Sequence, residues 1–107
     1  MATQGIVSVC SGGRVLMKVV AGCDGYNAEK LAGLLKERWP VDVDQAYEAA
    51  MQVDFGVESS LVVMTEDEVR FDGDEDLHPR YRETFSQPEF NPRWEYGVAD
   101  YVVVVDV

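Results

Sequence analysis

Two valine-rich runs flank the pair Gly12-Gly13, and this pattern constrains the fold more than any other feature of the chain. Residues 5–11 and 14–21 have the length of β-strands, and two glycines between such runs are typical of a tight hairpin turn. A two-residue turn places Cys10 opposite Val15. In that register one face carries Ile6, Ser8, Cys10, Val15, Met17 and Val19, and the other carries Val7, Val9, Leu16 and Lys18. Both faces are mostly apolar, so we expect the hairpin to lie inside a sheet rather than at its edge.

The segment after the hairpin has the spacing of two helices. Apolar side chains recur every three or four residues over 28–39, after Asn27 as the expected cap and before Pro40, which ends the pattern. Asp42 or Asp44 is then expected to cap a second helix. Because the link between the helices is short, we expect them to form an antiparallel pair on one face of the sheet.

The rest of the chain returns to strand patterns. Residues 61–65 and 69–72 form a predicted second hairpin around an acidic turn, and 73–98 hold three prolines, which exclude long helices there. Residues 99–107 end the chain with four consecutive valines, typical of a strand that is covered on both faces. The prediction is one compact α+β domain, 1–107. Its sheet is mostly antiparallel, in the order ββααββ, irregular stretch, β, with both helices on one face.

The cellular compartment follows from simple exclusions. No apolar run is longer than five residues, which excludes a membrane-spanning helix, and the first residues lack the pattern of a secretory signal. The cysteines, Cys10 and Cys23, are separated by about eight strand residues in the predicted hairpin, which is too far for a disulfide. We therefore expect a cytoplasmic protein with reduced thiols.

The charge of the chain is concentrated in its middle. There are 20 acidic and 9 basic residues, for a net charge of −11, and residues 42–76 contain twelve of the acids and a single base, Arg70. Such a segment produces a negative field that repels nucleic acid and anionic membrane surfaces. The expected partners are cations or basic protein surfaces, including those of nucleic-acid-binding proteins.

One acidic stretch has the spacing of a cation site. Asp72, Asp74, Asp76 and Glu83 occupy positions 1, 3, 5 and 12 of a segment that resembles the calcium loop of EF-hand proteins. The resemblance implies Ca²⁺ or Mg²⁺ binding by these four carboxylates. The segment departs from the pattern because position 6 is not glycine, position 8 is proline and the preceding residues are typical of a strand. The alternatives are a solvated acidic loop, or a small enzyme that uses these acids with the neighbouring His78.

Aromatic residues gather in the last third of the chain. Seven of the eleven lie in 71–101, among three arginines, and this mixture is typical of interface hot spots. Phe71 and Trp94 are therefore candidate anchors for a partner. The same residues can instead serve to pin an irregular segment on the sheet.

The sequence favours a non-enzymatic acidic interaction domain that presents carboxylates to a basic partner. Its most concrete form is a nucleic-acid-mimicking inhibitor of a DNA-binding or defence complex, since phosphates also form a regular array of negative charge. The alternative is the enzyme or divalent-cation protein centred on 72–83. No residue is predicted to be catalytic, and self-association is left open. The predicted partner-binding residues are Asp42, Asp44, Glu66, Asp67, Glu68, Asp72, Asp74, Glu75, Asp76, Phe71 and Trp94.

Overall fold

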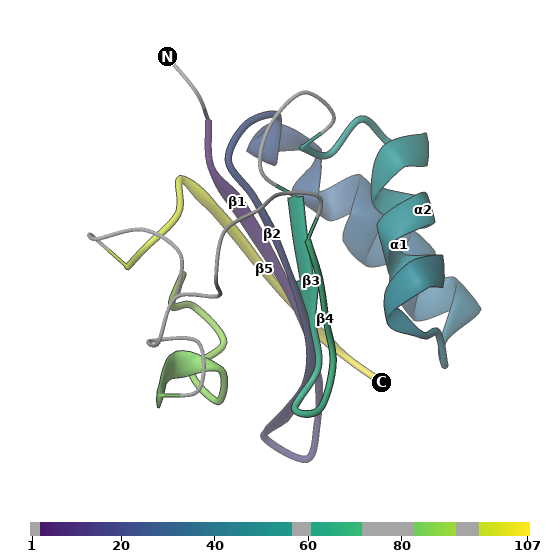
Figure 1. Ribbon diagram of the computed structural model, residues 1–107, viewed down its shortest axis with the longest axis vertical. Helices are drawn as coiled ribbons and strands as arrows, with labels where there is room; N and C mark the ends of the chain where they lie inside the picture. Colours follow the sequence, from purple (N-terminus) through teal and green to yellow (C-terminus); the bar gives the residue numbers. More distant parts are fainter. Residues whose placement is uncertain (1–2, 57–60, 72–82, 92–96) are drawn as a thin grey trace.

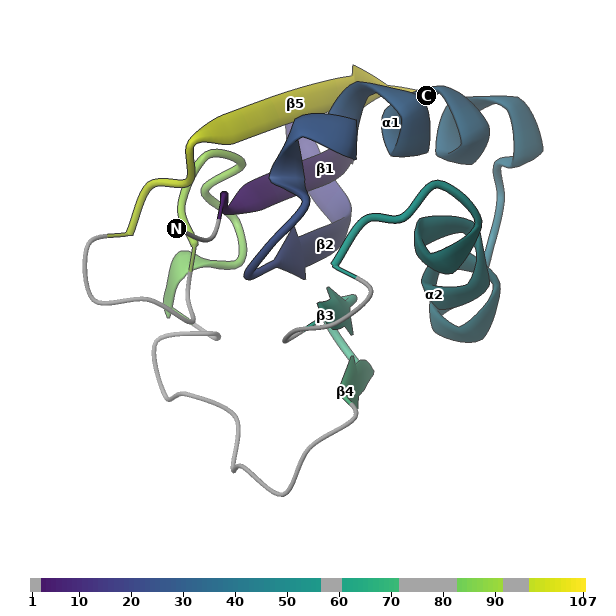
Figure 2. The ribbon, with the colours of Figure 1, turned by 90° about the horizontal axis from the view of Figure 1, so that it is seen from above.

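The structure is a five-stranded sheet with two helices on one face and a loop on the other (Figures 1 and 2). This computed structural model describes residues 3–56, 61–71, 83–91 and 97–107. The elements are β1 (Gly5–Ser11), β2 (Arg14–Ala21), η1 (Gly25–Asn27), α1 (Ala28–Arg38), α2 (Val43–Gln52), β3 (Leu61–Met64), β4 (Val69–Phe71) and β5 (Tyr101–Asp106). The predicted α+β class is confirmed. No helix in the described ranges is long and apolar enough to cross a membrane.

The strand order is β4-β3-β2-β1-β5. The first hairpin therefore lies inside the sheet, as predicted, and all neighbouring strands are antiparallel except β1 and β5, which are parallel. The prediction that the last strand is covered on both faces is wrong. β5 is an edge strand, and Val104 keeps 45% of its surface exposed.

A β-bulge changes which residues share a face of the first hairpin, so the predicted faces are wrong. Cys10 lies opposite Val15, as expected, but the register shifts next to it, so Val9 lies opposite Met17. Leu16 is the extra residue. Because side chains alternate between the faces of a strand, one additional residue moves every following side chain to the other face.

The bulge gives the sheet two different faces. Met17 and Val19 join the helix-facing core with Val7 and Val9, contrary to the prediction. Lys18 instead shares the opposite face with Ser8. This second face has its own small core, formed by Ile6, Cys10, Val15, Val20, Val62, Met64, Phe85 and Ala99.

Of the two predicted helix caps, the one at Asp42 is confirmed and the one at Asn27 is wrong. Asp42 caps α2 by accepting a hydrogen bond from the Gln45 backbone N–H at 2.8 Å, and the Gln45 side chain accepts one in return from the Asp42 N–H. Asn27 precedes α1, but its side chain makes no cap. Its Nδ2 donates to the backbone carbonyl of Asp54 at 3.2 Å and so joins the start of α1 to the end of α2.

A buried lysine holds the loop 83–91 against the second face. Lys18 is fully buried, and its Nζ donates to three backbone carbonyls, those of Thr84 at 3.1 Å, Gln87 at 2.7 Å and Phe90 at 2.9 Å. Ser8 Oγ donates to the carbonyl of Pro88 at 2.6 Å. All three N–H groups of the ammonium therefore have acceptors, as a buried charge requires.

Candidate interaction surface

The turn between β3 and β4 displays three consecutive carboxylates. Glu66, Asp67 and Glu68 are all exposed. Thr65 fixes their backbone, because its Oγ1 accepts hydrogen bonds from the N–H groups of Glu68 at 3.0 Å and Asp67 at 3.4 Å. The Thr65 N–H also donates to the Glu68 carbonyl at 2.8 Å. The turn is therefore a rigid platform for negative charge.

The start of α2 adds two further acids at the same end of the molecule. Figure 1 shows that α2 begins near the end of the sheet where both hairpin turns lie. Arg70 on β4 joins the two regions, because its Nη1 lies 2.8 Å from Oδ1 of Asp44 and its guanidinium lies 3.9 Å from the centre of the Tyr47 ring. We call the exposed group Asp42, Asp44, Glu66, Asp67 and Glu68 the acidic end.

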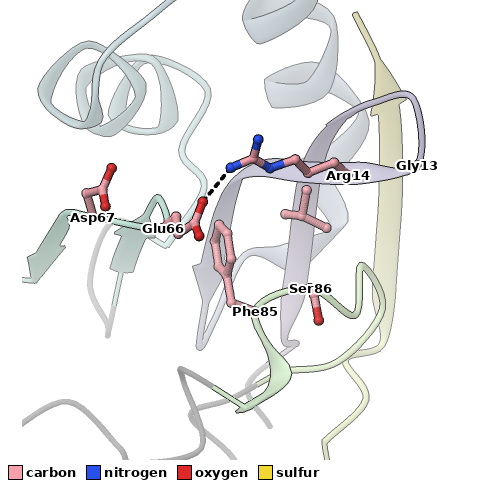
Figure 3. Close-up of a pocket in the computed structure, with 7 residues that line it drawn as sticks. Gly13, Arg14, Glu66, Asp67, Phe85 and Ser86 are labelled. Carbon is pink, nitrogen blue, oxygen red and sulfur yellow. Dashed lines mark hydrogen bonds and ion pairs between the residues drawn. The ribbon is translucent and has the colours of Figure 1, made fainter.

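An open groove of about 790 Å³ borders the acidic end. Its lining residues come from three separate parts of the chain: Gly13, Arg14, Val15, Glu66, Asp67, Phe85 and Ser86. Figure 3 shows Arg14 reaching to Glu66 across the groove, with the ring of Phe85 beside them. Val15 and Phe85 give the groove an apolar part, while Glu66 and Asp67 give it a charged wall.

The ion pairs leave part of the negative charge unbalanced. Arg14 Nη2 lies 2.5 Å from Glu66 Oε2, and both side chains are about two-thirds or more exposed, at 71% and 67%. Within the described part of the chain, Asp67 and Glu68 make no ion pair. These two carboxylates are therefore available to a cation from another molecule.

The thiols and the possible metal ligands of the described residues bear on the other sequence predictions. Cys10 and Cys23 are both free thiols, as predicted, and burial, followed by the charge of Asp106, raises the pKa of Cys10. A raised pKa keeps the thiol protonated and poorly nucleophilic. Across the described ranges, no three His, Cys, Asp or Glu side chains are grouped so that they could hold a metal ion.

The outcome for the predicted site residues is divided. The structure brings Asp42, Asp44 and the turn 66–68 to one end of the molecule. Four acids of the predicted surface lie outside the described residues: Asp72, Asp74, Glu75 and Asp76. Trp94, His78 and the side chain of Phe71 lie outside the described residues as well. Asp72, Asp74 and Asp76 are also three of the four predicted metal ligands. The fourth, Glu83, is exposed at the start of the loop 83–91. Calcium or magnesium binding by this group stays a prediction.

Sequence reasoning missed five of the seven residues that line the groove, namely Gly13, Arg14, Val15, Phe85 and Ser86. Arg14, Phe85 and Ser86 reach it from a hairpin turn and from the loop that Lys18 holds. The aromatic and arginine content of the last third pointed toward the region of Phe85 but not to this residue. Nothing in the sequence indicates the contact between Arg14 and Glu66, which are 52 positions apart.

Comparison with known proteins found no matching family model, no similar curated protein and no similar solved structure.

Proposed function

We propose that this chain is a non-enzymatic interaction domain that presents its acidic end to a basic surface of a partner protein. The turn 66–68 carries the proposal, because Thr65 fixes three exposed carboxylates beside an open groove. Rigid carboxylates bind a cation without the loss of side-chain and backbone freedom that a flexible segment would suffer. Asp67 and Glu68 gain an ion pair on binding without breaking one to any of the described residues.

The groove has the chemistry to accept a lysine or arginine side chain. The apolar stem of such a side chain would lie along Val15 and Phe85, and its charged head would meet Glu66 and Asp67. The exposed pair between Arg14 and Glu66 is worth at most about 1 kcal/mol. A guanidinium from the partner can therefore replace Arg14 at low cost.

In its most concrete form, the protein mimics nucleic acid and inhibits a DNA-binding or defence complex. Proteins that bind DNA do so largely through lysine and arginine contacts with its phosphates. The acidic end offers such a protein several carboxylates from two elements that Arg70 holds together.

The test is charge reversal of Asp67 and Glu68. The double variant Asp67→Lys/Glu68→Lys should slow association with an oligolysine peptide at low salt by about tenfold or more, and high salt should remove the difference. The control is Glu37→Lys/Glu89→Lys, which changes the net charge equally at exposed positions outside the acidic end. Equal slowing in both variants would show that only net charge matters and would contradict the proposal.

Mimicry has a separate test. The protein captures partners from a cell extract at low salt, and duplex DNA is then added to the captured complex. Displacement of the partner by DNA supports mimicry. A partner that binds DNA and this protein at the same time contradicts mimicry and leaves the acidic interaction domain standing.

A further inference from the structure

The outer edge of β5 is an open row of backbone hydrogen-bonding groups. The N–H groups of Tyr101 and Val107 donate to carbonyls on the β1 side. Because successive residues of a strand point their backbone groups to opposite sides, those of Val102, Val104 and Asp106 point away from β1. In the described part of the chain, no strand pairs with this edge. β5 can therefore accept one more strand.

The two edges of the sheet differ in how they are protected. Proteins protect edge strands by making them short or by placing lysine, proline or a bulge in them. β4, the opposite edge, has three residues and carries Arg70. β5 has six residues without lysine, proline or a register shift, and its one charged residue, Asp106, is the last. Tyr101 and Val104 are 46% and 45% exposed. The β5 edge is thus the one suited to pairing.

The helix beside this edge leaves room for an approaching molecule. α1 lies next to β5 (Figure 2), and a hollow of about 380 Å³ between them is lined by Ala32, Gly33, Lys36 and residues 104–106. A Cβ built on Gly33 would meet no atom within 4 Å. Small residues at this place allow another helix to approach closely.

The charges on this flank of α1 are complementary to those of a second, identical helix. Glu29 lies four residues before Gly33 and seven before Lys36, so the three side-chain positions share one face of the helix. If an identical helix packs antiparallel against this face, Glu29 of each copy meets Lys36 of the other. Ala32 and Gly33 then lie at the crossing point. This complementarity fits a second copy of the chain, because a two-fold contact repeats every pair.

We propose that two copies of the chain pair antiparallel along their β5 edges and form a two-fold symmetric dimer. The hollow places Ala32 and Gly33 beside Val104, so a single axis can pass through both contacts. Val104 then pairs with Val104 of the partner subunit, and the outward backbone groups of residues 102 and 106 pair with each other. The two five-stranded sheets become one continuous sheet.

The dimer keeps the acidic ends apart. β4 and the turn 66–68 belong to the edge of the sheet farthest from β5. The two acidic ends therefore lie at opposite ends of the joined sheet, well beyond the screening length of about 8 Å at physiological salt. Their repulsion does not oppose the contact, and the proposal does not depend on the function of the acidic end.

The first test is a charge exchange measured by analytical ultracentrifugation. The unaltered chain should sediment as a dimer, and Glu29→Lys and Lys36→Glu should each raise the dissociation constant at least tenfold. Mixing these two variants should restore a dimer. In the mixed dimer, one subunit has lysine at positions 29 and 36 and the other has glutamate at both, so every contact joins opposite charges. The controls are Glu37→Lys and Lys30→Glu, which make the same charge changes on the solvent side of α1 and should remain dimeric.

The second test is Val104→Pro, which removes one outward N–H without breaking a bond to β1. This variant should be monomeric with an unchanged circular dichroism spectrum. The proposal is overturned if the unaltered chain is monomeric at every concentration. It is equally overturned if the dimer survives both Val104→Pro and the single charge changes.

Discussion

Ser8 and Lys18 lie directly opposite each other on β1 and β2, and both donate hydrogen bonds to the same loop. Together they contact four of the carbonyl groups between residues 84 and 90. The pairing exists only because the bulge at Leu16 turns Lys18 to this face. The loop that carries Phe85, and with it one side of the groove, is therefore positioned by two polar residues of the central strands.

Replacement of Lys18 by methionine should release this loop. The variant removes a buried charge together with its three hydrogen bonds to the loop. The carbonyls of Thr84 and Gln87 keep one donor each, the N–H groups of Gln87 and Phe90, so the loss is that of the hydrogen bonds to a charged group, which are worth about 1.5–3 kcal/mol. We expect the free energy of unfolding to fall on the order of 2 kcal/mol, measured by urea denaturation. Hydrogen exchange should accelerate in residues 83–91 more than in α1. Lys30→Met, at an exposed position, is the control and should change neither quantity.

The same lysine predicts a specific pH dependence. Burial lowers the pKa of Lys18 from 10.5 to about 8 in the folded protein. Between these values the unfolded chain binds the proton and the folded chain does not, so folding becomes more favourable as pH rises. This difference in pKa changes the free energy of unfolding by about 3 kcal/mol in total. The added stability is fully present above the pKa of the unfolded chain, 10.5, and is lost as the pH falls to about 8.

The measurement compares the unaltered lysine with Lys18→Met from neutral pH to above the unfolded pKa. Both proteins should carry Cys10→Ala, because burial raises the pKa of that thiol and gives an effect of opposite sign. The stability difference between the two proteins should move in favour of Lys18 as pH rises. A difference that stays constant would show that Lys18 keeps its proton throughout this range.

Asp42 should have a structural role besides its place in the acidic end. Asp42→Ala removes the cap of α2 and should cost about 1 kcal/mol in thermal or urea unfolding. Asp42→Asn keeps the acceptor oxygen, so it should retain most of the stability while removing the charge. If the asparagine variant is as unstable as the alanine variant, charge rather than capping is responsible.

Two glycines predict opposite effects of the same substitution. A Cβ on Gly25 would lie 2.4–2.5 Å from the backbone of Gln4 and Gly5, so Gly25→Ala must separate η1 from the start of β1. We expect a loss of about 2 kcal/mol or more. Gly33→Ala meets open space within a helix and should gain up to about 1 kcal/mol, measured at low protein concentration. A neutral Gly25→Ala variant would contradict the close contact.

The two helices and the five strands could be predicted because their signals are local. The apolar spacing of 28–39, the proline after it and the acidic cap of α2 each act within a few residues. The bulge could not be predicted, since Leu16 is apolar and fits either register. Its effect on the faces of β2 is decided by which side chains the core and the loop 83–91 accept.

The final strand shows a different limit. Four valines are as typical of a central strand as of an apolar edge, because periodicity reports burial poorly in uniform runs. Which neighbours a strand has depends on the order in which distant segments pack. Among the described strands, β5 pairs with β1 alone, in parallel, and none of them pairs with its other side.

The sequence alone determined the α+β class, the excess of negative charge between residues 42 and 76, and the reduced thiols. Composition and short-range spacing are enough for these. Only the tertiary structure decided that Asp42 and Asp44 join the turn 66–68, that Arg14 and Phe85 complete a groove there, and that β5 lies at the edge of the sheet. These features depend on contacts between segments far apart in the chain, and such contacts are selected by the packing of the whole molecule rather than by any local pattern.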